Sequence, residues 1–135
     1  MTDTTKSIEQ LEKDFWSDID FPSVLVEKCH SYRKIPVQEL TTEQTRTLIG
    51  QNIGIKYLVP KAYEILSKNI LAEGDLYEGD LLSAVLSIDE VFWDSNPKWK
   101  ISFKNLVNLK QAEIVEKSES NIHRQLLKLI DKFII

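Results

Sequence analysis

The chain has 135 residues, of which 42% are hydrophobic and 28% are charged, and it contains a single cysteine. This composition excludes a disordered chain and a disulfide framework, and it is typical of one globular domain that buries its own core. The formal net charge of −4 argues against nucleic acid as a direct partner, because phosphate binding needs a basic surface.

Capping signals predict short helices in the first third of the chain. Ser7 and Gln10 have the spacing of a capping box and predict a helix over about residues 7–15. Ser23 predicts the start of a second helix, which ends before Pro36. Thr41 followed by Gln44 repeats the capping box and predicts a third helix.

Two glycines and a proline interrupt the middle of the chain. A 3.6-residue apolar period continues through Gly50 and Gly54 and resumes after Pro60. A proline inside a helix costs roughly 3 kcal/mol, so we predict two helices that meet near the glycines or the proline. The GxxxG spacing of Gly50 and Gly54 favours close approach of another helix, simple packing or a kink.

Turns and a further short helix follow. Gly74 and Gly79 each precede an aspartate and mark turns, and Asp80 is placed to cap the apolar segment 81–86. Ser87 with Glu90 has capping-box spacing and predicts another short helix.

The C-terminal third begins with Asn96 and Pro97, which predict the start of a long helix, although residues 100–107 also alternate as a strand would. A last helix from about Ser120 places one apolar stripe at Ile122, Leu126, Leu129 and Phe133. We therefore predict an all-α fold, a compact single-domain bundle of about six to eight short helices over residues 1–135.

Charge is unevenly distributed along the chain. Residues 69–97 contain no lysine, arginine or histidine, but they carry seven acids, namely Glu73, Asp75, Glu78, Asp80, Asp89, Glu90 and Asp94. Such a segment cannot neutralise itself locally, although the fold can bring the lysines of either flank over it.

Motifs for catalysis or cofactor binding are largely missing. His30 and His123 are far apart, and Cys29 and His30 are helix neighbours that point about 100° apart. Gly74 to Gly79 has half of a phosphate-loop pattern, but Asp80 stands where that motif needs lysine. We expect no enzyme activity, no cofactor and no metal. The remaining enzymatic alternative is a metal-dependent hydrolase built on the acidic residues 73–80.

The segments IGQNIGIKYLVPKAYEIL and LAEGDLYEGDLLSAVL, preceded by LEKDFW and DFPSVLVEKCHSYRKIP, resemble the immunity proteins of bacterial contact-dependent growth inhibition (CDI) systems. The likeness covers about residues 8–96, and the helices of 97–135 rest on periodicity alone. It implies a small cytoplasmic protein that binds the toxin domain of its own system, the C-terminal effector of a large secreted adhesin. Such toxins are commonly nucleases, with an RNase favoured, and the inhibitor covers the active site or substrate channel.

Residues shared by the family are expected to form its scaffold, because recognition of one cognate toxin depends on residues that differ among the members. We therefore choose the candidate toxin-binding residues by their charge. The predicted set is Glu73, Asp75, Glu78, Asp89, Glu90 and Asp94, with Trp93 as an apolar anchor. The acidic segment 17–22 is an alternative contact. A helical adaptor for another basic protein is the alternative within the binding class. We expect a monomer when free, a 1:1 complex with toxin, and neither a signal peptide nor a membrane span.

Overall fold

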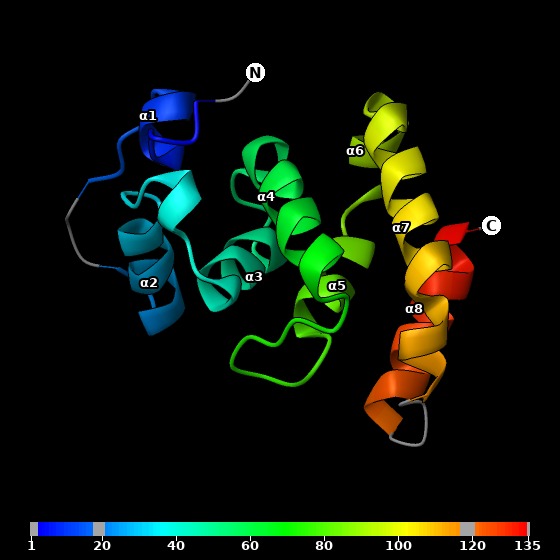
Figure 1. Ribbon diagram of the computed structural model, residues 1–135. Coiled ribbons are helices and arrows are strands. Elements are labelled where there is room, and N and C mark those ends of the chain that lie inside the picture. Colours follow the sequence, from blue (N-terminus) through cyan, green and yellow to red (C-terminus); the bar gives the residue numbers. More distant parts are fainter. Residues whose placement is uncertain (1–2, 18–20, 117–120, 135) are drawn as a thin grey trace.

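A computed structural model describes residues 3–17, 21–116 and 121–134, with side chains for all of these except 121–123. Within this part of the chain the fold is all-α, as predicted, with eight α-helices and one short 3₁₀ helix (Figure 1). In chain order they are α1 (Ile8–Glu12), α2 (Val24–Tyr32), η1 (Val37–Glu39), α3 (Thr42–Gly50), α4 (Ile55–Lys68), α5 (Asp80–Leu86), α6 (Glu90–Ser95), α7 (Pro97–Glu116) and α8 (Asn121–Ile134).

The predicted caps of the first three helices are confirmed. Ser7 and Thr41 each form a full capping box, and the hydroxyl of Ser23 accepts from the Val26 amide. The first helix is shorter than predicted, because it ends at Glu12 and Lys13 takes a left-handed conformation with φ 56°.

The junction between α3 and α4 lies at the glycines, and Pro60 is inside α4 rather than at its end. Gly54 begins α4 with φ 64°, a conformation that favours glycine. The first residue of α1 packs against one member of the GxxxG pair, since a Cβ at Gly54 would lie 2.8 Å from the Ile8 side chain, whereas a Cβ at Gly50 would meet nothing within 4 Å. Close approach of another helix is therefore found at Gly54 and not at Gly50, and the chain turns from α3 into α4 between the two glycines.

Ser87 and Asp80, which are predicted to cap helices at their start, have other roles in the structure. Ser87 closes the end of α5, and Asp89 caps α6 by accepting from the Val91 amide at 2.8 Å. Asp80 does not cap α5, because Gly79 occupies the cap and the Asp80 carboxylate bonds to the preceding loop instead. A carboxylate in the first helical turn still benefits from the positive end of the helix dipole.

The C-terminal pair of helices follows the predicted pattern. Pro97 begins α7, and the strand alternative for residues 100–107 is wrong because that segment is helical. The buried face of α8 carries Leu126, Ile130 and Phe133, whereas Leu129 is half-buried. Ser120 and the side chain of Ile122 lie outside the described residues.

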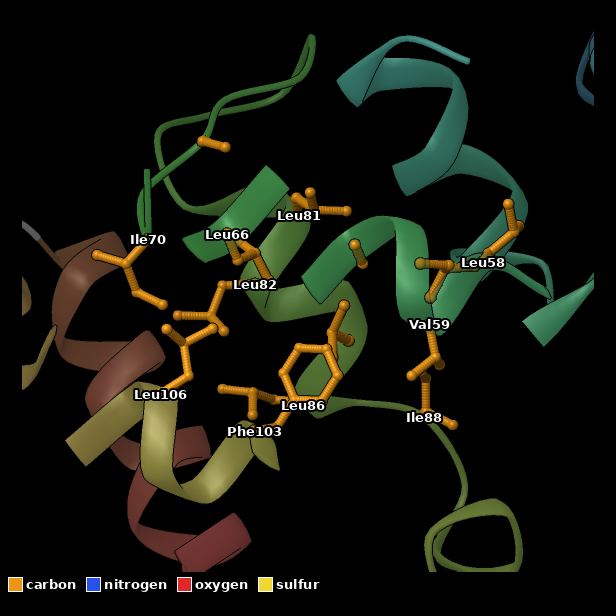
Figure 2. Close-up of a cluster of buried hydrophobic side chains, with 14 of the residues drawn as sticks. Leu58, Val59, Leu66, Ile70, Leu81, Leu82, Leu86, Ile88, Phe103 and Leu106 are labelled. Carbon is orange, nitrogen blue, oxygen red and sulfur yellow. The ribbon is translucent and has the colours of Figure 1, made fainter. Parts of the chain in front are cut away.

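The core lies where α3, α4 and α5 pack together, with α7 against α4 and with α8 against α5 and α7. In Figure 2 the ring of Phe103 from α7 faces the leucines of α5 and the buried side of α4. In Figure 1 α1 and α2 lie at one side of the molecule, and α7 and α8 lie at the other. No helix in the described residues is long and apolar enough to cross a membrane.

Candidate functional site

The predicted toxin-binding residues fall into two groups at opposite ends of α5. Residues 73–79, here called the acidic loop, lie between α4 and α5 and are at the bottom of Figure 1, whereas α6 is at the top. Glu73 and Asp75 on the loop are exposed and Glu78 is half-buried. At the other end Asp89, Glu90 and Asp94 are exposed. The cation-free segment therefore forms two separate acidic surfaces.

Asp80 holds the acidic loop in shape. Its side chain is 1% exposed and accepts hydrogen bonds from the backbone amides of Gly74 at 2.6 Å and Leu76 at 3.0 Å. A third amide, that of Tyr77, lies 3.4 Å from Asp80 Oδ2. Buried carboxylates are tolerated when their oxygens are bonded in this way, so the loop backbone is fixed from inside.

Two residues of α3 complete this scaffold. Glu43 accepts the Asp75 amide at 2.8 Å and takes two bonds of 2.6 Å from the Arg46 guanidinium. Arg46 Nε also lies 3.6 Å from Asp80 Oδ2. Bonding to Arg46 lowers the pKa of Glu43 from 4.5 to about 2, and the same pair raises the pKa of Arg46. A cation from outside residues 69–97 thus contacts an acid of this segment, but the cation is Arg46 of α3 and not a lysine.

Sequence reasoning missed Glu43 and Arg46. The sequence signal that could have found them is their i, i+3 spacing on a predicted helix, together with the absence of cations from residues 69–97. Gly74 belongs to the same cluster, since a Cβ there would overlap the carboxylate of Glu43 and come within 3.0 Å of Asp80. Only a residue without a side chain fits between these groups.

The surface of the acidic loop combines charge with an apolar side chain. Leu76 is 63% exposed, and it stands between the exposed Asp75 and the half-buried Glu78. An apolar side chain within a polar rim is the usual composition of a protein interface.

The structure corrects the role of Trp93. Its side chain is only 2% exposed, because the indole packs edge-on against Phe92, Phe103 and Phe133 with ring centroids 5.1, 5.6 and 5.1 Å away. A ring held in this cluster cannot be an exposed anchor. The exposed apolar residue of α6 is its neighbour Val91, at 70%.

Two adjoining cavities connect the two acidic ends along α8. The first, of about 330 Å³, lies between the α5–α6 connection and α8, and Asp89 and Glu90 are at its edge. The second, also about 330 Å³, lies between α5 and α8 and includes Tyr77 of the acidic loop. Leu129 and Lys132 line both cavities. We call this continuous surface, from the acidic loop to α6, the α5–α8 face.

No cluster of three or more His, Cys, Asp or Glu side chains in the described residues is arranged to hold a metal ion. Cys29 is 2% exposed and lies in the core, and this burial raises the pKa of its thiol. His30 is buried between the rings of Trp16 and Phe21, and the side chain of His123 lies outside the described residues.

A comparison with known protein families shows which family the chain belongs to. Residues 10–102 match the family of CDI immunity proteins. The chain belongs to the CDI immunity proteins. Family membership confirms the resemblance seen in the sequence and makes this protein the toxin-neutralising partner in a CDI system. No curated protein and no solved structure gives a match.

The matched region has a clear relation to the two acidic ends. It runs from α1 into the beginning of α7, so it includes the acidic loop, α5 and α6. The remainder of α7 and all of α8 follow it. In this CDI immunity protein one side of the α5–α8 face is therefore formed by residues within the family match, and the other side is formed by α8, which lies outside it.

Proposed function

We propose that this CDI immunity protein neutralises a nuclease toxin, with an RNase favoured, by covering its active site or substrate channel with the α5–α8 face. The observation that supports this face is its pair of exposed acidic ends, joined by two cavities. A nuclease needs a cationic surface to bind phosphates, and an acidic inhibitor is complementary to that surface. The partner is the toxin domain at the C-terminus of a large secreted adhesin.

The acidic loop supplies the rigid part of the contact. Its backbone amides are bonded to the carboxylates of Asp80 and Glu43, so little loop freedom is left to lose on association. Leu76 inserts into the toxin surface while Glu73 and Asp75 meet basic side chains around it.

The acids of α6 act mainly before contact. Glu90 and Asp94 are exposed and four residues apart, on the same side of α6. Exposed charges of this kind speed the encounter of oppositely charged proteins more than they strengthen the final complex. The protein acts in the cytoplasm as a monomer that forms a 1:1 complex.

The test is an activity titration. The toxin domain encoded by the reading frame directly upstream is incubated with RNA while the immunity protein is added in steps. We expect RNA cleavage to fall linearly and to stop at one immunity protein per toxin. Undiminished RNA cleavage in the presence of bound immunity protein would contradict occlusion, and a toxin that cleaves no RNA would contradict the RNase assignment.

A further inference from the structure

Helix α7 carries apolar side chains on two opposite faces. The face that packs against the rest of the bundle consists of Phe103, Leu106, Val107 and Ile114. On the outer face Ile101, Leu109 and Val115 are 58%, 77% and 49% exposed. The outer side of a surface helix is normally charged or polar, so α7 leaves an apolar face without a partner.

The residues of this outer face follow a line along the helix. Its exposed positions are spaced alternately by four and three residues, and they are Ile101, Asn105, Asn108, Ala112 and Val115. This is the spacing by which two helices pack along their length. At 1.5 Å per residue the line extends over about 21 Å, with Leu109 beside it. All of these side chains are uncharged, and we call this surface the α7 stripe.

The two ends of α7 carry charges that the helix itself disfavours. Lys98 lies in the first turn and Glu116 in the last, and both are exposed. A positive charge near the N-terminus and a negative one near the C-terminus oppose the helix dipole. The two residues are five turns apart, so they lie on the same side of the helix, and within the described residues neither forms an ion pair. Each charge would gain from an opposite charge brought from outside the chain.

A second copy of this chain supplies those charges. When two α7 helices lie antiparallel, Lys98 faces Glu116 of the partner subunit at both ends of the pair. The same register places Ile101 opposite Ala112 of the partner subunit and Asn105 opposite Asn108 of the partner subunit, where the amide groups can donate to and accept from each other. A parallel pair would instead bring like charges together, and a basic nuclease would gain little from an uncharged stripe.

We propose that the α7 stripe is the interface of a weak antiparallel dimer of this immunity protein. The dimer goes beyond toxin binding, because the stripe lies on the side of α7 opposite its buried residues and leaves the α5–α8 face of each copy free for one toxin. A single pair of helices is smaller than the interfaces of about 1,200 Å² or more that give stable complexes. The protein is therefore a monomer at low concentration and a dimer at high concentration.

The first test is sedimentation of the full-length protein without toxin. We expect the wild type to change from monomer to dimer between about 10 µM and about 1 mM, the range of weak complexes. Ile101→Glu puts a charge into the stripe and should give a monomer throughout. Val24→Glu is the matched control, because it makes the same kind of change at a 69% exposed residue of α2 on the other side of the molecule. A monomeric wild type at about 1 mM, or equal loss of the dimer in Val24→Glu, would overturn the proposal.

Charge reversal tests the antiparallel register. Lys98→Glu should raise the dimer Kd by about fivefold, because both end pairs become like-charged. Adding Glu116→Lys to Lys98→Glu restores opposite charges and should return the Kd to the wild-type value. Failure of the double variant to recover would contradict this pairing.

Toxin inhibition separates this dimer from the proposed function. Ile101→Glu should still stop RNA cleavage at one immunity protein per toxin, because residue 101 lies outside the α5–α8 face. Loss of inhibition in this variant would show that the two surfaces are not independent and would overturn the dimer as a separate contact. Failure of the wild-type protein to inhibit its toxin would instead refute the proposed function and leave the dimer measurements standing.

Discussion

The two ends of α5 carry similar acidity but use it differently. At the acidic loop the carboxylates of Asp80 and Glu43 are turned inward to backbone amides and to Arg46. At α6 only Asp89 bonds to backbone, and Glu90 and Asp94 are directed to solvent. Acidic residues around α5 therefore divide into those that hold the acidic loop in shape and those that remain exposed to solvent.

Removal of Asp80 should have the largest effect, because it is the buried centre of the acidic-loop scaffold. Asp80→Ala leaves three backbone amides and part of the Arg46 charge without their acceptor. We expect the free energy of unfolding to fall by about 3 kcal/mol, measured by urea denaturation. Asp75→Ala, which removes an exposed carboxylate from the same loop, should change it by less than about 0.5 kcal/mol. Equal effects would show that the loop is not held by Asp80.

Gly74 and Gly50, neither of which has a positive φ, give a matched pair. Gly74→Ala places a methyl group against the Glu43 and Asp80 carboxylates, and should destabilise the protein by about 1–3 kcal/mol. Gly50→Ala meets open space at the end of α3 and should be neutral or stabilising by up to about 1 kcal/mol. Thermal unfolding of the two variants beside wild type checks this, and a stable Gly74→Ala protein would refute the tight packing of the cluster.

The features that can be predicted from the sequence are those set by residues close together in the chain. The caps at Ser7, Ser23 and Thr41 were predicted correctly because each cap involves residues three positions apart. The prediction for Asp80 is wrong because its carboxylate bonds to amides of the preceding loop instead of to its own helix, and the prediction for Trp93 is wrong because its ring packs against the sequence-distant Phe133. No local pattern shows that a carboxylate turns away from the helix it begins, or that a tryptophan beside an exposed aspartate faces inward.

Acid should weaken the acidic-loop scaffold through Glu43. Its pKa is about 2 in the folded protein against 4.5 ordinarily, so the native state binds fewer protons than the unfolded chain between these values. The stabilisation is complete above pH 4.5 and is lost as the pH falls toward 2. Glu43→Gln should remove this part of the acid dependence, measured by denaturant unfolding across pH 2–6. Glu64→Gln on the exposed side of α4 is the control, and an unchanged slope in Glu43→Gln would contradict the assignment.

The smallest expected effect is kinetic and concerns α6. Reversing Glu90 and Asp94 to lysine, with Asp89 left to cap the helix, should slow association with the toxin and flatten its salt dependence. Leu76→Ala in the acidic loop should instead speed dissociation, because it removes an anchor rather than a long-range charge. Stopped-flow measurements at two ionic strengths separate these outcomes. Unchanged association of the α6 variant at low salt would remove the steering role of α6.

Hydrogen–deuterium exchange of the immunity protein with and without its toxin domain tests the α5–α8 face most directly. We expect slower exchange in the complex at residues 73–79, at 86–94 and along α8, with α2 unchanged. Protection confined to α1 and α2, with the acidic loop and α8 exchanging as in the free protein, would contradict it.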